Sequence, residues 1–173
     1  MIRLRKLEEK DIPFMLEWMH DPEVNCYFQF DGNTIDEKRV RDFISNSFNE
    51  KNRHYAAADF ETDEYLGTFS LENIDLENKH AMVAAAFRKC THGTDCTHLA
   101  FQEIMRIGFE ELGLEKIYAN TLESNSRCCR YVEKNGFHFD GRFRKHLLIR
   151  GEWHDWMWYS LLKEEYEALK KEK

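Results

Sequence analysis

The first fifty residues carry one short alternating stretch, followed by apolar residues at helical spacing. Apolar side chains alternate with arginines within residues 1–7, which predicts a strand. The Asp-Pro step at 21–22 interrupts the helical pattern, because proline disfavours helical geometry in the residue before it. Thr34 followed by Glu37 is typical of a capping box at a helix start. This part of the chain therefore predicts three helical segments: 9–19, 22–29 and about 35–49.

The rest of the chain alternates between strand-like and helix-like periodicity. Residues 54–60 and 65–73 repeat with period two and are separated by a short acidic stretch, as in a hairpin. Residues 79–87 are nearly all apolar, which predicts a central strand covered on both faces. Gly113 and Gly136 follow two helical segments, at the place where glycine commonly ends a helix. The remaining predicted strands are 116–122, 137–148 and 153–162, and the remaining helices are 95–112, 126–135 and 163–172.

This order of elements predicts an α/β fold. Strand–helix–strand units with a hairpin at each end imply a mixed, mostly antiparallel sheet of about seven strands, with helices on both faces. A chain of 173 residues suits a single domain, 1–173, and its 42% share of hydrophobic residues supplies a core.

The net charge and the cysteine content limit the classes of partner and cofactor that this protein is expected to bind. A formal net charge of −7 disfavours nucleic acid, whose phosphates would be repelled, and suits a cationic acceptor such as an amine. There is no apolar signal-peptide core and no apolar run near the roughly 20 residues of a membrane span, so we expect a cytoplasmic protein without a membrane partner. The five cysteines form no CxxC pair, which predicts free thiols. Cys90, His92 and Cys96 fit no zinc spacing, so no metal site is expected.

Two segments in the second half carry motifs of a known family. The stretch 87–116 resembles the exit of the fourth strand, the pyrophosphate loop and the following helix of the Gcn5-related N-acetyltransferases (GNAT). Asn125 then follows a strand, and the next helix ends in Glu-Lys-Asn-Gly-Phe at 133–137, as in that family. Both ends of the chain resemble the subgroup that acetylates ribosomal-protein N-termini, polyamines and amino sugars. The resemblance implies a sheet splayed between its fourth and fifth strands, and an N-acetyltransferase that passes the acetyl group of acetyl-CoA directly to a primary amine.

The resemblance also implies where acetyl-CoA binds. The backbone at Phe87 and Arg88 would contact the pantetheine, and Asn125 would contact the cofactor or an ordered water at the reaction centre. A helix N-terminus offers unpaired N–H groups and a partial positive charge, which together suit a diphosphate. The loop implied to hold the diphosphate consists of His92, Gly93, Thr94, Asp95, Cys96 and Thr97.

Asp95 stands where the family keeps a glycine. A carboxylate about 5 Å from one phosphate charge costs roughly 3 kcal/mol at an effective dielectric of 20. That exceeds the roughly 0.3–1 kcal/mol that an acidic residue gains at a helix start. His92 and Thr97 also depart from the family pattern. A second hypothesis is therefore open, in which the chain is a GNAT-fold binding module with weakened or lost acetyl-CoA binding and Asp95 is only a helix cap.

Acetyl transfer needs a neutral amine, and a carboxylate commonly removes its proton. The predicted strand 79–87 offers no acidic residue, so Glu72 and Glu123 are the candidates, although each also suits a solvated surface position. Val132 occupies the place where relatives often have a tyrosine that protonates the leaving thiolate. Tyr131 beside it is turned by about 100° around the helix.

The resemblance places the acceptor beside the end of the first helix, where the candidates are Trp18, His20 and Asp21. His154 near the last turn is a candidate for lining the substrate. The sequence places no serine or cysteine beside it that could serve as a nucleophile. The sequence names no acceptor: a peptide N-terminus, a polyamine, an amino sugar and an aminoglycoside all stay open, and so does a homodimer.

Overall fold

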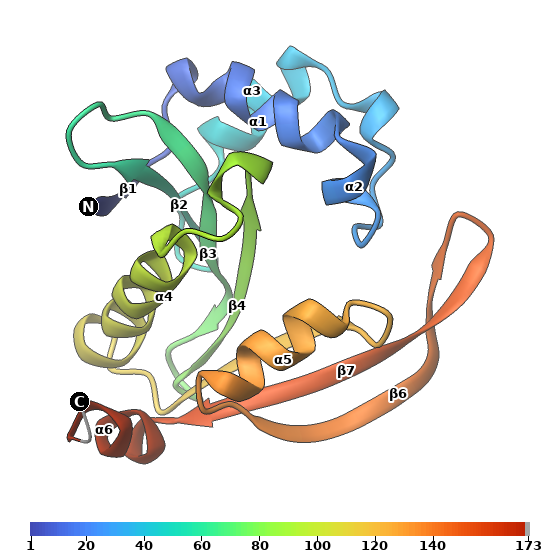
Figure 1. The fold of residues 1–173 in the computed structure, drawn as a ribbon. Coiled ribbons are helices and arrows are strands. Elements are labelled where there is room, and N and C mark those ends of the chain that lie inside the picture. The colour runs from blue at the N-terminus through green and yellow to red at the C-terminus, as the bar shows by residue number, and fades with distance from the viewer. Residues whose placement is uncertain (172–173) are drawn as a thin grey trace.

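All seven strands of the computed structural model, which describes residues 1–171, join one sheet (Figure 1). The strand order is β1-β2-β3-β4-β5-β7-β6; the β4–β5 pair is parallel and the other five pairs are antiparallel. This confirms the mixed, mostly antiparallel sheet that the sequence predicts. The strands are β1 Ile2–Lys6, β2 Arg53–Asp59, β3 Tyr65–Asp75, β4 His80–Phe87, β5 Lys116–Leu122, β6 His138–Ile149 and β7 Glu152–Leu162.

The helices lie close to the predicted segments. The last of them was predicted to reach residue 172, which lies outside the described residues. No helix within residues 1–171 combines the length and apolar character that a membrane crossing requires. The helices are α1 Ile12–His20, α2 Pro22–Asn25, α3 Glu37–Ser45, α4 Cys96–Arg106, α5 Ser126–Lys134 and α6 Lys163–Lys171.

The two faces of the sheet carry separate apolar clusters. On one face, side chains of α4, α5 and α6 form a cluster with sheet residues such as Phe69 and Leu71 of β3. On the other face, α1 and α3 pack on side chains such as Tyr65. Successive side chains of a strand alternate between the two faces. Ala57 of β2 therefore belongs to the first cluster and its neighbour Ala56 to the second. We call these the α4 face and the α1 face.

The central strands β4 and β5 diverge, and Figure 1 shows β4 running away from β7, the other neighbour of β5. They pair only at His80–Lys116, Ala81–Ile117 and Met82–Tyr118. Beyond Met82 the two strands separate, so the rest of β4 faces no hydrogen-bonded neighbour on that edge. This is the splay between the fourth and fifth strands that the resemblance implies.

The expected capping box at Thr34 is wrong. Thr34 ends a single 3-10 turn, and its hydroxyl donates to the Asp31 carbonyl at 2.8 Å. Helix α3 begins later, and Asp36 caps it by accepting from the Arg39 N–H at 2.8 Å. Asp36 thus satisfies a free N–H group two residues later than the Glu37 N–H that Thr34 was expected to bond.

The predicted helix 95–112 is divided in two. Its last turn, Ile107–Glu111, widens into a π-helix. Gly108 lies in this turn because β5 approaches it closely: a Cβ there would come within 2.5 Å of the Ile117 Cδ1. The close approach brings the end of the helix against the strand that forms one arm of the splay.

Candidate cofactor and acceptor site

The open edge of β4 can bind an extended ligand through its backbone. The Arg88 N–H donates to the Leu66 carbonyl of β3 at 3.0 Å. Because successive residues of a strand turn their hydrogen-bonding groups toward opposite edges, those of Val83, Ala85 and Phe87 point toward β5. That edge is unpaired beyond Met82. The splay therefore offers a row of backbone donors and acceptors, with Phe87 at its outer end.

The loop before α4 ends at a helix start that can receive an anion. The Leu99 N–H donates to the Asp95 carbonyl at 2.9 Å, so the N–H groups of the preceding helical residues have no partner within the helix. Thr94 is already engaged, because its N–H donates to the Thr91 carbonyl at 3.1 Å. Gly93 adopts a φ of +81°, and a side chain there would meet no atom within 4 Å. The Cys96 N–H is engaged too, donating to the Thr94 Oγ1 at 3.4 Å. The fit to a diphosphate thus rests on the N–H groups of Thr97 and His98.

Asp95 occupies the N-cap position of α4 without capping it through its side chain. Its φ of −80° is ordinary for any residue, so the backbone does not require the family's glycine here. The side chain is exposed, and solvent screens its charge. The electrostatic cost to a bound diphosphate is therefore smaller than for a buried carboxylate.

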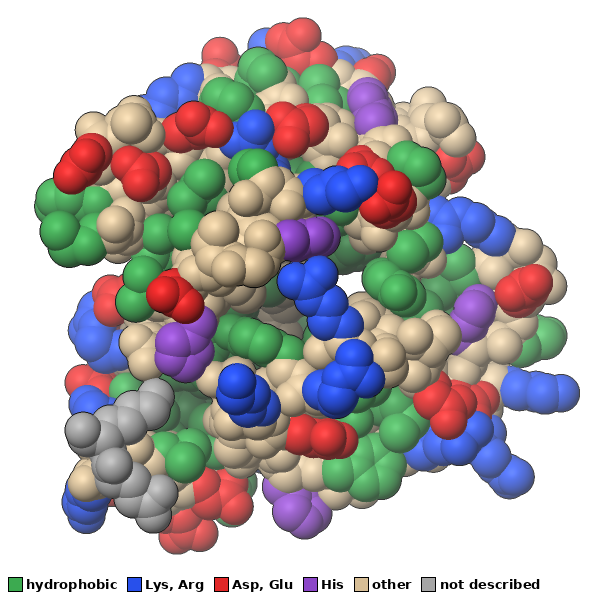
Figure 2. Space-filling view, viewed as in Figure 1, with side chains coloured by type: hydrophobic (Ala, Val, Ile, Leu, Met, Phe, Trp, Pro, Cys, Tyr) green, Lys and Arg blue, Asp and Glu red, His purple; other side chains and the backbone are tan. Residues whose placement is uncertain are grey.

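Basic side chains lie near the same helix start. Burial lowers the pKa of His92 below its ordinary value; Arg127 and Lys89 add to this effect, and Asp21 and Glu23 oppose it. Figure 2 shows Lys, Arg and His side chains on both sides of the hollow between the two halves of the molecule. Arg127 lies in the first turn of α5, and the sequence pattern did not single it out. Arg127 therefore adds a positive charge to the surroundings of His92.

Arg88 and Asn125 use their side chains within the protein. The guanidinium of Arg88 is buried, pairing with Glu17 at 2.8 Å and Glu64 at 2.5 Å, and it lies over the Phe14 ring. Asn125 caps α5, its Oδ1 accepting from the Cys128 N–H at 3.1 Å. The Arg88 backbone is engaged as well, because its N–H donates to the Leu66 carbonyl and its carbonyl accepts from the Thr91 N–H at 3.1 Å. Of the two residues expected to contact the pantetheine through their backbone, only Phe87 therefore has groups on the open edge of β4.

Val132 is buried in the cluster of the α4 face. The neighbouring Tyr131 hydroxyl donates to the Thr97 carbonyl at 3.4 Å, in the first turn of α4. Burial raises the pKa of this hydroxyl well above its ordinary value. Tyr131 thus ties α5 to the helix start of α4 and stays protonated at neutral pH.

Glu72 lies at the closed end of the splay, on the α1 face. It is opposite Met82 across β3 and β4, and Met82 is opposite Tyr118 in the last β4–β5 pair. Directly opposite residues of neighbouring strands share a face. The Glu72 side chain is 28% exposed, and burial raises the pKa of its carboxyl above the ordinary value.

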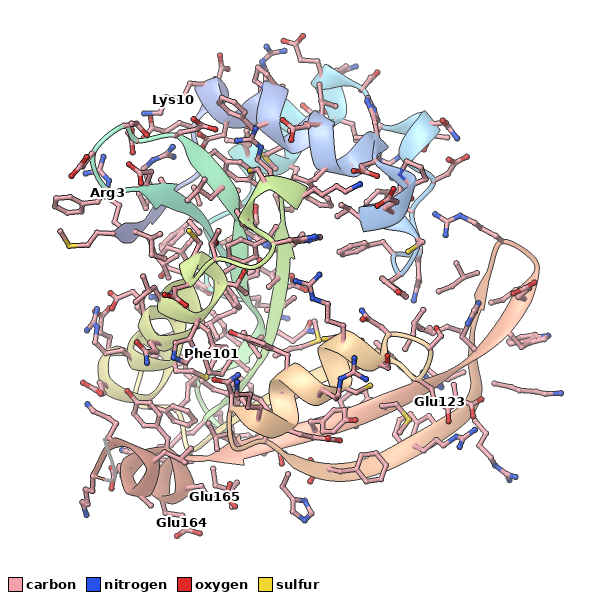
Figure 3. The ribbon with its side chains drawn as sticks, viewed as in Figure 1. Arg3, Lys10, Phe101, Glu123, Glu164 and Glu165 are labelled. Atoms are coloured by element: carbon pink, nitrogen blue, oxygen red, sulfur yellow. The ribbon has the colours of Figure 1, made fainter. Side chains whose placement is uncertain are left out.

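Glu123 lies beyond the other end of β5. Figure 3 shows it beside the β6–β7 hairpin. Its side chain is 49% exposed, and its Oε1 pairs with the Arg142 Nη1 at 3.0 Å. Arg142 also binds Asp155, whose backbone carbonyl accepts from the Glu123 N–H at 3.2 Å. Glu123 therefore belongs to an exposed charged group on the β6–β7 hairpin.

The four acceptor-site candidates have different environments. Trp18 is 5% exposed and belongs to the core, its Nε1–H donating to the Tyr65 hydroxyl at 3.0 Å. Asp21 caps α2 by accepting from the Glu23 N–H at 2.9 Å. His20 lines a cavity of about 400 Å³. His154 is half-buried on β7, opposite Leu147.

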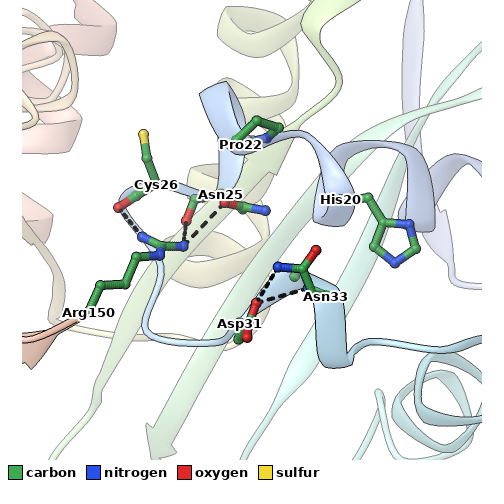
Figure 4. Close-up of a pocket in the computed structure, with 8 residues that line it drawn as sticks. His20, Pro22, Asn25, Cys26, Asp31, Asn33 and Arg150 are labelled. Atoms are coloured by element: carbon green, nitrogen blue, oxygen red, sulfur yellow. Dashed lines mark hydrogen bonds between the residues drawn. The ribbon is translucent and has the colours of Figure 1, made fainter.

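Arg150 closes that cavity from the opposite half of the molecule. It lies in the turn between β6 and β7 and donates to the Cys26 carbonyl at 3.0 Å and to the Asn25 carbonyl and Oδ1, each at 3.3 Å (Figure 4). Buried Asn25 in turn donates to the Met19 carbonyl at 2.7 Å. The last hairpin and α2 thus meet across the α1 face of the splay.

Aromatic side chains continue this face onto the last hairpin. The Trp158 ring stacks on Tyr118 with centroids 5.4 Å apart, and Trp156 meets Trp158 edge to face. Trp156 and Trp158 lie on one face of β7, as alternate residues of a strand do, and both are half-buried.

A comparison with known proteins agrees with this geometry. The model of the acetyltransferase (GNAT) domain matches residues 2–138. The chain belongs to this family. It is accordingly an acyltransferase of the N-acetyltransferase class, with acetyl-CoA as cosubstrate, and the open β4 edge and the α4 helix start fit that cosubstrate.

Relatives of this GNAT protein include an uncharacterized N-acetyltransferase, p20, of Bacillus licheniformis. It is 28% identical over 169 residues, which cover 95% of this chain and 94% of the relative. A protein of Bacillus subtilis (strain 168) provisionally named as a ribosomal N-acetyltransferase, YdaF, is 32% identical over 104 residues, which cover 60% of this chain and 57% of that protein.

Solved structures share the fold. The spermidine N-acetyltransferase from Vibrio cholerae, in complex with CoA and spermine, superposes with a TM-score of 0.86 at 18% identity, covering 96% of this chain and 98% of that one. A GNAT-family acetyltransferase from Bacillus anthracis gives a TM-score of 0.83 at 23% identity, covering 94% and 95% of the two chains.

Proposed function

We propose that this protein transfers the acetyl group of acetyl-CoA directly to a primary amine of a small molecule or peptide, with Glu72 as the general base. The observation that carries the proposal is the position of Glu72. It lies on the α1 face at the point where β4 and β5 part. An amine that approaches the splay from this face meets a half-buried carboxylate there.

The residues of the donor side bind and orient the cosubstrate. Acetyl-CoA supplies an activated acetyl group as a thioester. The open backbone edge at Val83, Ala85 and Phe87 suits its pantetheine, and the free N–H groups at the start of α4 suit its diphosphate. Both arms of the splay are held in place by buried contacts, so this binding surface exists before the ligand arrives.

Glu72 is placed to remove the proton of an ammonium group. A primary amine with a pKa near 10.4 costs about 4.6 kcal/mol to deprotonate at pH 7. A carboxylate accepts the proton more readily when its own pKa is higher, and burial raises the pKa of Glu72. Glu123 is exposed and paired with Arg142, so it is the weaker candidate.

The acceptor binds, in this proposal, between α2, the last hairpin and the α1 face of the sheet. The net charge of −7 favours a cationic amine there. His20 and Arg150 line this region, and Tyr118 and Trp158 extend it with aromatic surface. Relatives named for ribosomal proteins and for spermidine support two acceptors to test first, a ribosomal-protein N-terminus and a polyamine.

The experiment that tests the proposal combines binding and turnover. We expect calorimetry to detect acetyl-CoA binding at submillimolar concentration. We expect the release of free CoA thiol with at least one amine from a panel of spermidine, glucosamine, kanamycin and an N-terminal peptide. An absence of binding at millimolar acetyl-CoA would instead support the binding-module hypothesis, in which the cosubstrate site has been lost.

Arg127 provides a further test of the cosubstrate site. We expect Arg127→Ala to weaken acetyl-CoA binding about threefold to tenfold at low ionic strength, because it removes a cation near the proposed diphosphate position. The effect should shrink at 0.5 M salt, since the side chain is exposed. Arg130→Ala, at another exposed position of α5, is the matched control. Equal losses from both variants would indicate a general effect of net charge.

A further inference from the structure

Glu72 has a histidine beside it that the proposed mechanism does not yet use. The Nδ1 of His54 on β2 lies 3.7 Å from the Glu72 Oε1 and 2.6 Å from the Ser70 Oγ. Ser70 is buried, and the His54 side chain is only 13% exposed. The three side chains form a compact polar group on the α1 face of β2 and β3.

Packing holds the imidazole in this orientation. Its ring lies against Phe43 of α3, with centroids 4.7 Å apart. The Ser70 hydroxyl holds Nδ1 from β3, the strand that also carries Glu72. The ring therefore cannot swing away from the carboxylate without losing both contacts.

The Glu72 carboxylate determines which ring nitrogen of neutral His54 carries the hydrogen. A negative oxygen 3.7 Å away is stabilised by an N–H at Nδ1 and repelled by a lone pair there. We therefore assign the proton of neutral His54 to Nδ1, from which it donates to the Ser70 Oγ. In this tautomer the positive end of the N–H dipole lies near Glu72 and favours its ionised form. A protonated imidazole would favour that form more strongly.

We propose that His54, oriented by Ser70, is a positioning residue that keeps the Glu72 carboxyl ionised and therefore ready to accept the proton of the acceptor amine. The inference rests on the proposed function, because only there does Glu72 act as a base. Burial alone would favour the protonated, inactive acid. The His54 N–H offsets part of that effect, so the carboxyl remains basic without becoming neutral at physiological pH.

The other groups around Glu72 do not replace His54. Across β4 the opposite residue is Met82, which carries no charge. From β5 the facing titratable side chain is Tyr118, whose pKa is raised chiefly by burial, so it stays neutral in this range. Burial lowers the pKa of His54, so the imidazole is mainly neutral at pH 7 and acts through its N–H dipole.

The test compares His54→Phe with the wild-type protein. Phenylalanine keeps an aromatic ring against Phe43 and removes the N–H. We expect the pKa of the Glu72 carboxyl to rise by about one unit. The titration is measured by ¹³C NMR of labelled glutamate side chains, and the Glu72 signal is assigned as the one missing in Glu72→Gln. The acidic limb of kcat/KM should move to higher pH by the same amount. At a pH below the acidic limbs of both proteins, kcat/KM of His54→Phe should be about tenfold lower than that of the wild type.

Three further variants separate positioning from a structural role. His54→Gln keeps an amide donor and should restore part of the shift, and Ser70→Ala should shift the same pKa in the same direction. His80→Phe is the matched control, because His80 is half-buried but faces Asp75. An unchanged or lowered Glu72 pKa in His54→Phe, or an equal rise in His80→Phe, would overturn the inference.

The NMR measurement does not depend on turnover. If no amine is acetylated by the wild-type protein, the proposed function fails, while the titration still decides whether His54 controls Glu72. If Glu72→Gln retains full turnover, Glu72 is not the base, whatever the titration shows.

Discussion

Glu72→Gln is expected to lower kcat about a hundredfold at pH 7, in keeping with the typical contribution of a general base. Glutamine has nearly the same shape but accepts no proton from an ammonium group. The loss should become smaller toward pH 10, because the free amine is then abundant and needs no base. In the wild type, activity should rise with pH through the raised pKa of Glu72, since only the ionised carboxyl accepts a proton. Release of CoA thiol, followed between pH 6 and 10, provides the measurement.

Glu123→Gln is the natural control for this experiment. It removes an exposed ion pair with Arg142, so we expect turnover within about twofold of the wild type and little change in stability. The opposite outcome, a pH-dependent loss in Glu123→Gln and none in Glu72→Gln, would make Glu123 the base. A loss in Glu72→Gln that is the same at every pH would indicate that Glu72 binds the acceptor instead.

Asp95→Gly is expected to tighten acetyl-CoA binding about tenfold at low salt, equivalent to about 1.4 kcal/mol. The change removes a negative charge from the helix start proposed to bind the diphosphate. The gain is smaller than for a buried carboxylate, because Asp95 is exposed and solvent screens its charge. Its stability cost should be a few tenths of a kcal/mol at most, since the side chain makes no capping bond. Calorimetry and thermal unfolding of the same variant give both quantities.

Asp95→Asn separates charge from backbone effects. It removes the charge and keeps a side chain, so it should recover most of the gain, and the gain should decrease in 0.5 M salt. Asp140→Asn on β6 changes the net charge equally at an exposed site and should leave the affinity unchanged. Unchanged affinity in both Asp95 variants would show that the diphosphate lies elsewhere or that the carboxylate turns away from it.

The backbone architecture was largely predictable from the sequence. The apolar run at 79–87 predicts a central strand, and β4 indeed lies between β3 and β5 in the sheet. Gly136 predicts the end of α5, and the structure shows it directly after the last turn, with a φ of +87°. Both signals are local, because they depend on side-chain burial along one strand or on the conformation of one residue.

The site was less predictable, because its chemistry depends on neighbours from distant segments. Glu72 and Glu123 are equivalent as acidic residues in the sequence. Pairing between strands places Glu72 beside Met82 and His54, half-buried, whereas the last hairpin pairs Glu123 with Arg142 in solvent. His54 and Arg127 carry no local signal of function, and they become relevant only because folding brings them near Glu72 and His92.

By itself, the sequence determined the order of the strands and helices, the family resemblance and the departure at Asp95, because these depend on residue identity and periodicity. The tertiary structure decided which carboxylate is half-buried, which arginine is already paired and which helix-start N–H groups are free. Arg88 shows the difference: its position suggests cofactor contact, but its guanidinium is enclosed between Glu17 and Glu64. Burial and electrostatic coupling act through space at a few ångströms, so they depend on contacts between segments that the linear pattern does not contain.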